Sequence, residues 1–228
     1  MAKNVKITTL PNILDYIAPH SCLGCGKIGS ILCDRCKNYI VSQHLDFCPN
    51  CKLPQQSHRC ASCQSLPEIY TIAPRRGLLD SLVHTYKYDS VRALAPVFAD
   101  LLSQILPADL PPSTIVVPLP TSTKHIRERG FDHTLLIAKY LARRRGWRVS
   151  RTITRAKNTV QVGSDKSARL AQASQAYSLS PKFTPDNTSA YLLLDDVWTT
   201  GASMISAFKL LRATEAADIR LALLTFGL

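Results

Sequence analysis

Two adjacent carboxylates, Asp195 and Asp196, follow the apolar segment 191–194, Tyr-Leu-Leu-Leu. An apolar run of this kind is typical of a strand in a parallel sheet that is covered on both faces. The acids then fall at the carboxyl end of the strand, which is where open α/β sheets bind ligands. Carboxylates in that position can accept hydrogen bonds from hydroxyl groups or bind a metal ion.

A run of small residues follows the acids and precedes apolar residues that recur at helical spacing from Met204 to Leu211. A small-residue turn at a helix N-terminus presents backbone N–H groups and the positive end of the helix dipole to an anion, typically a phosphate. Each feature alone is common in α/β proteins, but their uninterrupted order indicates a ligand with a phosphate at one end and a polyol beside it. The residues that we expect to form this phosphate loop are Thr199, Thr200, Gly201, Ala202 and Ser203.

The eight cysteines of the chain all lie within residues 22–63 and form four CxxC pairs. A CxxC pair holds two thiolates close enough to share one tetrahedral zinc ion, and two pairs complete a closed structural site. Disulfides or a redox dithiol are the alternatives, but a cytosolic chain disfavours the first and the fourfold repetition disfavours the second. We therefore predict two structural zinc sites with the ligands Cys22, Cys25, Cys33, Cys36, Cys48, Cys51, Cys60 and Cys63.

The sequence leaves open which pairs share a zinc ion. Sequential pairing gives two compact sites and is the arrangement we favour, whereas cross-bracing joins the first pair to the third and the second to the fourth. With all ligands supplied by thiolates, the nearby residues His20, His44 and His58 are expected to be surface or packing residues. A module this small builds little core alone, so metal binding would drive its folding. We assign residues 1–68 to this double zinc-ribbon module.

The remaining residues, 69–228, alternate helical and strand patterns and are assigned to one α/β domain. Apolar residues at helical spacing predict helices over 91–105 and 131–141. Apolar or β-branched runs predict strands at 114–117, near 149–154, at 191–194 and near 219–225. Strands that alternate with helices imply a mostly parallel sheet flanked by helices. The segment 155–180 has few large apolar residues and is expected to form a flap.

Length and composition limit the class of protein. A chain of 228 residues can hold one domain of about 150 residues plus a small module, and a hydrophobic content of 46% excludes wholesale disorder. No apolar run approaches the roughly 20 residues that span a membrane, and the first 20 or so residues lack the continuous apolar core of a signal peptide. We therefore expect a cytoplasmic protein without membrane insertion.

The net charge of +12 is unevenly distributed, since residues 124–157 carry eleven Lys or Arg and only two acids. Such a density predicts an anionic partner: the phosphates of a small ligand, a nucleic acid, or both. Within this region an aromatic ring lies among arginines, so it could stack on an unpaired base of single-stranded DNA while the arginines meet phosphates. The alternative is a cationic helix end that complements its own dipole and needs no partner. The candidate nucleic-acid residues are Arg143, Arg144, Arg145, Trp147, Arg148 and Arg151.

Several motifs together resemble the ComF family, the competence proteins named for DNA uptake, over almost the whole chain. They are ILDYIAPHSCLGCG at 13–26, YKY at 86–88, VVPLP at 116–120, RERGF at 127–131, TVQ at 159–161 with a later Arg, and the segment 191–203. The chain departs from the family pattern after RGF, where Asp132 and His133 replace the usual Asn-Gln. It departs again in the flap, where Gln172 replaces the usual Asn three residues after Arg169.

The resemblance implies a type I phosphoribosyltransferase fold and the ligand phosphoribosyl pyrophosphate (PRPP) with magnesium. In that fold family the acid pair, here Asp195 and Asp196, holds the ribose hydroxyls and is our candidate for the catalytic pair. The departing pyrophosphate must be stabilised by magnesium and by backbone or cationic donors. For this role we place the segment 117–122, VPLPTS, as the pyrophosphate loop, with Leu119, Pro120 and Thr121 as its binding residues. Arg127 and Arg129 are the cationic helpers, and Arg155 and Arg169 lie on the flap.

The acceptor of a phosphoribosyl transfer is not indicated by the residues. In the similar hypoxanthine-guanine transferases an Asp contacts the base from the position that is Thr199 here, and threonine cannot act as a general base near neutral pH. Trp198 could stack on a base or pack beneath the loop. The prediction is therefore a ComF-like protein that binds PRPP and single-stranded DNA, with an uptake helicase or recombination proteins as partners. The alternative is an active phosphoribosyltransferase of nucleotide metabolism without a DNA role.

Overall fold

The computed structural model describes residues 20–55, 58–155, 177–214, 216 and 218–227. Its centre is a five-stranded parallel sheet in the order β1-β7-β6-β2-β3, which confirms the predicted α/β class. The strands are β1 (Ile69–Pro74), β2 (Ile115–Pro118), β3 (Arg148–Val149), β6 (Ala190–Trp198) and β7 (Asp218–Phe226). Two further short strands, β4 (Ile153–Arg155) and β5 (Tyr177–Leu179), form an antiparallel pair. The predicted flap residue Arg169 lies outside the described residues.

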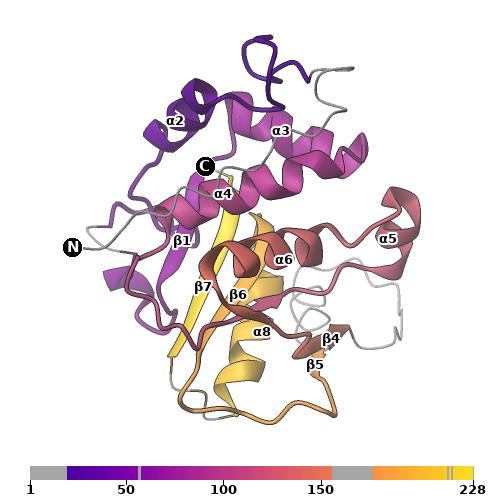
Figure 1. Cartoon of the computed structure of the whole chain (residues 1–228). Helices are drawn as coiled ribbons and strands as arrows, with labels where there is room; N and C mark the ends of the chain where they lie inside the picture. Colours follow the sequence, from indigo (N-terminus) through magenta and orange to yellow (C-terminus); the bar gives the residue numbers. More distant parts are fainter. Residues whose placement is uncertain (1–19, 56–57, 156–176, 215, 217, 228) are drawn as a thin grey trace, which may run out of the picture.

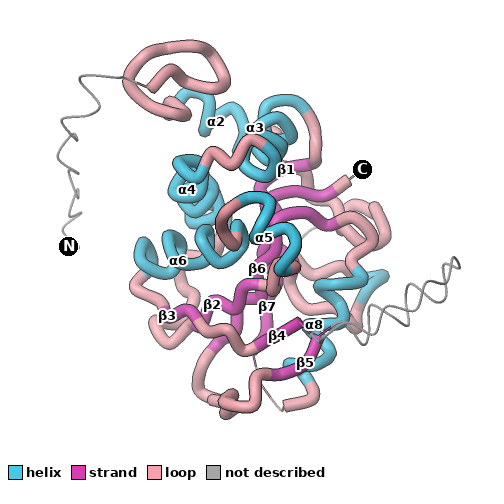
Figure 2. The backbone as a smooth tube through the Cα atoms, turned by 90° about the vertical axis from the view of Figure 1, so that its right-hand side faces the viewer, coloured by secondary structure: helices cyan, strands magenta, loops and turns pink. Residues whose placement is uncertain are grey.

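Helices cover both faces of the sheet (Figures 1 and 2). One face carries α3 (Gly77–Tyr88), α4 (Ala95–Ile105) and α6 (His133–Arg145), and the other carries α8 (Ala202–Arg212). The remaining elements are α2 (Asp34–Ser42), the short α5 (Thr123–Arg129), and the 3-10 turns η1 (Ala61–Cys63) and η2 (Arg92–Leu94). None of the helices in the described part of the chain is long and apolar enough to cross a membrane.

The alternation of side chains along β6 explains why its sequence is apolar without interruption. Leu192 and Leu194 join the core beneath α4 and α6, whereas Tyr191 and Leu193 join the core beneath α8. Successive residues of a strand point to opposite faces, so a strand covered on both faces needs apolar residues at every position.

The sheet changes the direction of its connections between β2 and β6. The chain passes from β2 through α6 to β3 on one face, and from β6 through α8 to β7 on the other. Pairing of β2 with β6 ends at Leu194, whereas β6 stays paired with β7 as far as Trp198. The acids thus lie within β6, which ends at Trp198, four residues beyond the strand end expected from the sequence, because β7 continues the ladder. A crevice at such a point is the usual ligand site of an open α/β sheet.

The cysteine-rich segment is joined to the same body. Leu32 and Ile40 belong to the core that lies beneath α4 and α6. The Nζ of Lys37 on α2 lies 3.0 Å from Oδ2 of Asp100 on α4, and Nη2 of Arg144 on α6 lies 2.5 Å from Oδ1 of the same carboxylate. Farther along, the Nζ of Lys52 donates to the carbonyl of Gly227, just after β7.

Trp147 lies in the core rather than on the surface. Its side chain is 8% exposed, and the Arg145 guanidinium lies 4.5 Å from the centre of its ring. The same guanidinium donates to the carbonyls of Ser103 (3.2 Å) and Pro107 (2.5 Å). Trp147 and Arg145 therefore fasten the C-terminal end of α6 to α4 and to the turn after it, and they offer little surface for a base to stack on.

This burial predicts that Trp147→Ala lowers the free energy of unfolding by about 3–5 kcal/mol, because it removes a large core side chain. Urea denaturation followed by circular dichroism measures the loss. The matched control is Tyr140→Ala on α6, whose aromatic ring is 39% exposed, and a change of under about 1 kcal/mol is expected. Equal losses in the two variants would contradict the core placement of Trp147.

Candidate functional site

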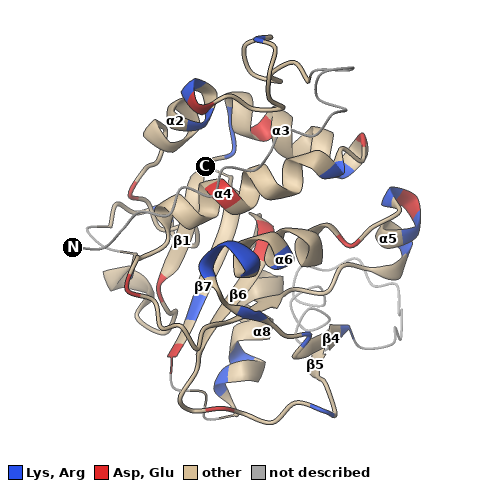
Figure 3. Ribbon diagram, viewed as in Figure 1, with Lys and Arg blue, Asp and Glu red and all other residues tan. Residues whose placement is uncertain are grey.

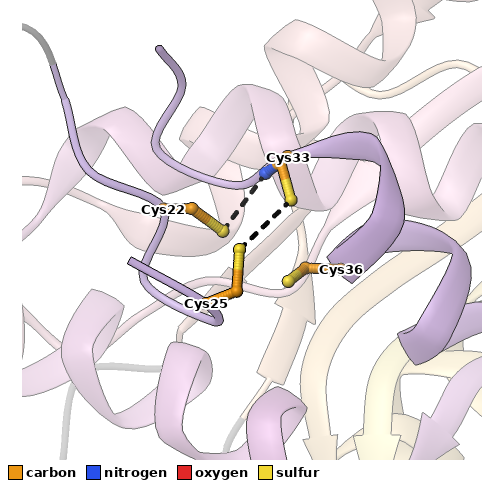
Figure 4. Close-up of side chains that lie close together, drawn as sticks. All are labelled: Cys22, Cys25, Cys33 and Cys36. Atoms are coloured by element: carbon orange, nitrogen blue, oxygen red, sulfur yellow. Dashed lines mark hydrogen bonds between the residues drawn. The ribbon is translucent and has the colours of Figure 1, made fainter. Parts of the chain in front are cut away.

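The cysteines form two groups of four, and the grouping follows the sequential pairing. Cys22, Cys25, Cys33 and Cys36 form one group, and Cys48, Cys51, Cys60 and Cys63 form the other, with all sulfurs of a group within 4.8 Å of one another. Figure 4 shows the first group, with Cys25 from the loop before α2 turned toward Cys33. Sulfur separations of 3.6, 3.9 and 3.5 Å occur within the groups. Four sulfurs at 2.3 Å from one zinc ion would lie about 3.8 Å apart, so both groups fit tetrahedral zinc.

Backbone amides favour the thiolate form in each group. The N–H groups of Gly24 and Cys33 each lie 3.4 Å from Sγ of Cys22. Burial acts to raise the pKa of Cys22, but hydrogen bonds from backbone N–H groups lower it to about 6. The backbone N–H of Leu53 lowers the pKa of Cys51 to about 7 in the second group. Since zinc binds thiolates, these donors favour the ligand form of Cys22 and Cys51, whereas burial raises the pKa of Cys36 and of Cys48 to about 12.

A cavity of about 270 Å³ opens at the crevice between β2 and β6. Eight of the residues predicted to bind PRPP line it: Leu119, Pro120, Thr121, Arg129, Arg155, Asp195, Asp196 and Ser203. A smaller pocket next to it is formed by the phosphate loop, 199–203, and shares Asp195 and Ser203 with the cavity. Among the residues of the described chain that were predicted for this site, Arg127 on α5 is exposed and lines neither space. The structure thus gathers segments from three parts of the chain around one space.

The two acids occupy different surroundings, because neighbouring residues of a strand face opposite sides of the sheet. Asp195 lies on the same side of β6 as Tyr191 and Leu193, which face α8, and it borders the pocket of the phosphate loop. Burial, together with the negative charge of Asp196, raises the pKa of Asp195 to about 8. Burial acts in the same direction on Asp196, but the hydrogen bond from His133 and the Lys87 ammonium hold the pKa of that carboxyl well below its usual range.

Two residues that contact Asp196 were not predicted from the sequence. The Nζ of Lys87, near the end of α3, lies 2.7 Å from Oδ2 of Asp196, and Nε2 of His133, at the start of α6, contacts the same oxygen. Lys87 lies in the YKY motif, and His133 lies at the departure from the family pattern after RGF. Both residues thus lie in or beside sequence motifs, but only the folded chain brings them to Asp196.

Gly201 shapes the phosphate loop. Its φ of +74° is rarely adopted by other residues, and a Cβ at this position would lie 2.2 Å from Cζ2 of Trp198. Trp198 is 1% exposed, so it packs beneath the loop and does not present its ring to a ligand. The loop leads into α8, and Thr200 and Ser203 are exposed at its start. A helix N-terminus of this kind can receive a phosphate.

The pyrophosphate loop and the basic segment after it meet at the opposite side of the cavity. Thr121 Oγ1 donates to Oδ1 of Asp132 at 2.9 Å, and Asp132 also caps α6 by accepting from the N–H of Leu135. The guanidinium of Arg129 lies 5.7 Å from the ring centre of Tyr88. Arg155 on β4 lies 6.0 Å from the ring centre of Tyr177, and both residues line the cavity. Arg129 and Arg155 are therefore the predicted cations that can reach a ligand there.

The candidate nucleic-acid residues lie at the C-terminal end of α6 and in the segment 147–151 after it, where basic residues gather (Figure 3). Arg143, Arg148 and Arg151 are exposed. Arg144 is exposed as well, but it pairs with Asp100, and Nη2 of Arg148 lies 3.8 Å from Oδ2 of Asp186. Trp147 is buried and Arg145 packs against its ring, so the exposed arginines are the part of this set that can meet phosphates.

Together these residues can bind an anionic, hydroxyl-bearing ligand. The phosphate loop offers backbone donors at a helix N-terminus, and the ionised Asp196 accepts hydrogen bonds from hydroxyl groups. Arg129 and Arg155 supply positive charge on the other side of the cavity. Among the described residues that line the cavity, the carboxylates are Asp195 and Asp196.

Two curated proteins are similar to this chain over most of its length. Competence protein ComFC of Streptococcus pneumoniae (strain ATCC BAA-255 / R6) is 25% identical over 197 residues, which cover 84% of this chain and 86% of that protein. Competence protein ComFC of Bacillus subtilis (strain 168) is 26% identical over 212 residues, covering 82% of this chain and 81% of that protein. No protein-family model matches the chain. The two similarities confirm the resemblance seen in the sequence motifs.

The two cysteine groups predict two zinc ions per purified chain, measured by elemental analysis. Cys33→Ser leaves the first site with three thiolates, and Cys60→Ser does the same to the second. Each variant should lose about one zinc ion and melt at a lower temperature, because metal binding contributes directly to folding. A wild-type chain that carries one zinc ion, or iron, would contradict the assignment.

The contact between Gly201 and Trp198 predicts a larger effect of Gly201→Ala than of Gly146→Ala. Both glycines have similar backbone angles, with φ of +74° and +70°, but a Cβ at Gly146 would meet no atom within 4 Å. The control should therefore show the backbone strain alone, about 1–2 kcal/mol. Overpacking against Trp198 should add about 1–3 kcal/mol to the loss of unfolding free energy in Gly201→Ala. Equal losses in urea denaturation would show that Trp198 moves aside freely.

Proposed function

We propose that this chain, which is similar to the ComFC competence proteins over four fifths of its length, is a competence-related protein that binds PRPP with magnesium and single-stranded DNA. The observation that carries the ligand proposal is the meeting of the acid pair, the phosphate loop and the pyrophosphate loop around one cavity. Reduced thiols that hold structural zinc favour a cytoplasmic location. An uptake helicase or recombination proteins are proposed as partners through the resemblance alone.

In the proposed complex each segment takes one part of the ligand. The phosphate loop binds the 5′-phosphate, and Asp195 and Asp196 accept hydrogen bonds from the ribose hydroxyls. The loop Leu119–Thr121 faces the pyrophosphate, with Arg129 and Arg155 as its cations. Magnesium would neutralise the charge of the pyrophosphate. Asp195 is the stronger acceptor when it is ionised, which its raised pKa opposes and a nearby cation would favour.

Binding and turnover are separate questions for this site. Thr199 stands where the similar transferases carry a base-contacting acid, and it cannot serve as a general base. The proposal is therefore a PRPP-dependent binding protein. An active phosphoribosyltransferase of nucleotide metabolism is the alternative, and release of pyrophosphate in the presence of an acceptor base would favour it.

The DNA part of the proposal rests on a separate observation, the exposed arginines at the C-terminal end of α6 and just after it. The exposed arginines are Arg143 on α6, Arg148 on β3 and Arg151 in the connection between β3 and β4. Arg155, four residues farther on, lines the cavity. Cations arranged in this way can follow the phosphates of a single strand.

Magnesium PRPP should raise the melting temperature, because a ligand that binds only the folded state stabilises it, by about 2.7 kcal/mol at a hundredfold excess over Kd. The double variant Asp195→Asn with Asp196→Asn should lose this rise. The control is Asp109→Asn, which changes an exposed acid in a turn far from the acid pair in the sequence, and this variant should keep the rise in melting temperature. A rise that persists in the double variant would place the ligand elsewhere.

Single-stranded DNA should bind with an affinity that falls as salt rises, because arginines displace counterions from the phosphates. The triple variant Arg143→Gln, Arg148→Gln, Arg151→Gln should bind more weakly and lower the slope of log K against log salt by up to about 2, at about 0.7 per phosphate contact. The charge-matched control replaces the exposed residues Arg35, Lys209 and Arg212 by Gln. If the control variant loses as much affinity as the triple variant, the interaction depends on net charge and not on this surface.

A further inference from the structure

His133 is held between the two sides of the cavity. It is the first residue of α6 and is 6% exposed. Its Nε2 contacts Oδ2 of Asp196, while its carbonyl accepts a hydrogen bond of 2.7 Å from the Tyr86 hydroxyl. On the other side of the ring, Nδ1 lies 3.1 Å from Nη1 of Arg129 and 3.2 Å from Oγ1 of Thr121. The ring therefore connects the ribose side of the cavity to its pyrophosphate side.

The partners of the ring determine which nitrogen carries the proton. A guanidinium can only donate, so Nδ1 must accept from Arg129. The single hydroxyl proton of Thr121 is donated to Asp132, which leaves Arg129 as the donor to Nδ1. The ring proton then lies on Nε2 and is donated to the Asp196 carboxylate. A hydrogen bond into Nδ1 polarises the ring and strengthens the donation from Nε2, because linked hydrogen bonds reinforce one another.

A diphosphate in the cavity would compete for Arg129. A charged phosphate oxygen is a stronger acceptor for a guanidinium than a neutral ring nitrogen. If Arg129 turns to the ligand, Nδ1 loses its donor and Nε2–H becomes a weaker donor to Asp196. More of the negative charge of that carboxylate is then available to the ribose hydroxyls.

We propose that His133 is a positioning residue that couples the two ends of the ligand, so that binding of the diphosphate at Arg129 strengthens binding of the ribose at Asp196. The proposal rests on the proposed ribose-phosphate ligand. It assigns the coupling to the exchange of one hydrogen-bond donor at Nδ1, and it treats the Lys87 ammonium as the fixed partner of Asp196.

The test is calorimetric titration of the full chain with ribose 5-phosphate, alone and in saturating magnesium pyrophosphate. In the wild type, pyrophosphate should tighten ribose 5-phosphate binding about fivefold or more, the lower end of typical coupling between sites. His133→Leu has no donor or acceptor and should bring this factor to one. His133→Gln, whose amide can donate to Asp196 and accept from Arg129, should keep it.

Retention of the wild-type factor in His133→Leu would overturn the proposal, and so would its loss in His133→Gln. If the wild type binds neither ribose 5-phosphate nor PRPP, the proposed function itself fails.

A second measurement does not depend on whether the His133→Leu variant folds. The Nδ1 nitrogen-15 resonance of His133, assigned with His133→Gln, should show an unprotonated nitrogen in the free wild-type chain and should shift when magnesium pyrophosphate is added. A protonated Nδ1, or a resonance that does not move, would overturn the proposal.

Discussion

The ligand end of the molecule depends on compensation of one buried charge, the carboxylate of Asp196. Its side chain is 8% exposed, and its Oδ2 contacts Lys87 from α3 and His133 from α6. Removal of one partner from such a buried pair typically costs about 3–5 kcal/mol, because the remaining charge is left without compensation. Both helices must therefore stay seated on the same face of the sheet. The hydroxyl of Tyr86 on α3 also joins the two helices, because it donates a hydrogen bond to the carbonyl of His133, the first residue of α6.

The position of the acids within the sheet explains how one dipeptide can reach two sides of the cavity. Asp195 and Asp196 face opposite sides of β6, so Asp195 borders the pocket of the phosphate loop and Asp196 contacts Lys87 on α3 and His133 on α6. In the middle of a sheet, residues on opposite faces cannot share a cavity. Here they can, because β2 separates from β6 at Leu194 and opens the edge beside them. Proline at the end of β2 suits this separation, since it removes a donor from the ladder.

The cysteine groups are linked physically to the sheet that carries the site. Asp100 on α4 holds both Lys37 from the segment of the first group and Arg144 from α6. Lys52, next to Cys51 of the second group, bonds the carbonyl of Gly227 at the end of β7. The N–H of Gly227 in turn lies 3.2 Å from the carbonyl of Trp198, which supports Gly201 in the phosphate loop. Folding of the cysteine segment and order at the ligand site should therefore accompany each other.

The sequence by itself determined the features that local chemistry encodes. Hydrophobic spacing predicted the parallel α/β sheet, CxxC pairs predicted the cysteine groups, and the order of acids, small residues and helix predicted the phosphate loop at 199–203. It did not determine which distant residues compensate Asp196, because Lys87 and His133 are separated from it by more than 60 residues and meet it only when α3 and α6 pack on the sheet. Nor did it show that Trp147 is a core residue: an aromatic ring among arginines has the same sequence whether it is exposed or buried. Burial depends on the packing of α6 against α4, and that packing exists only in the tertiary structure.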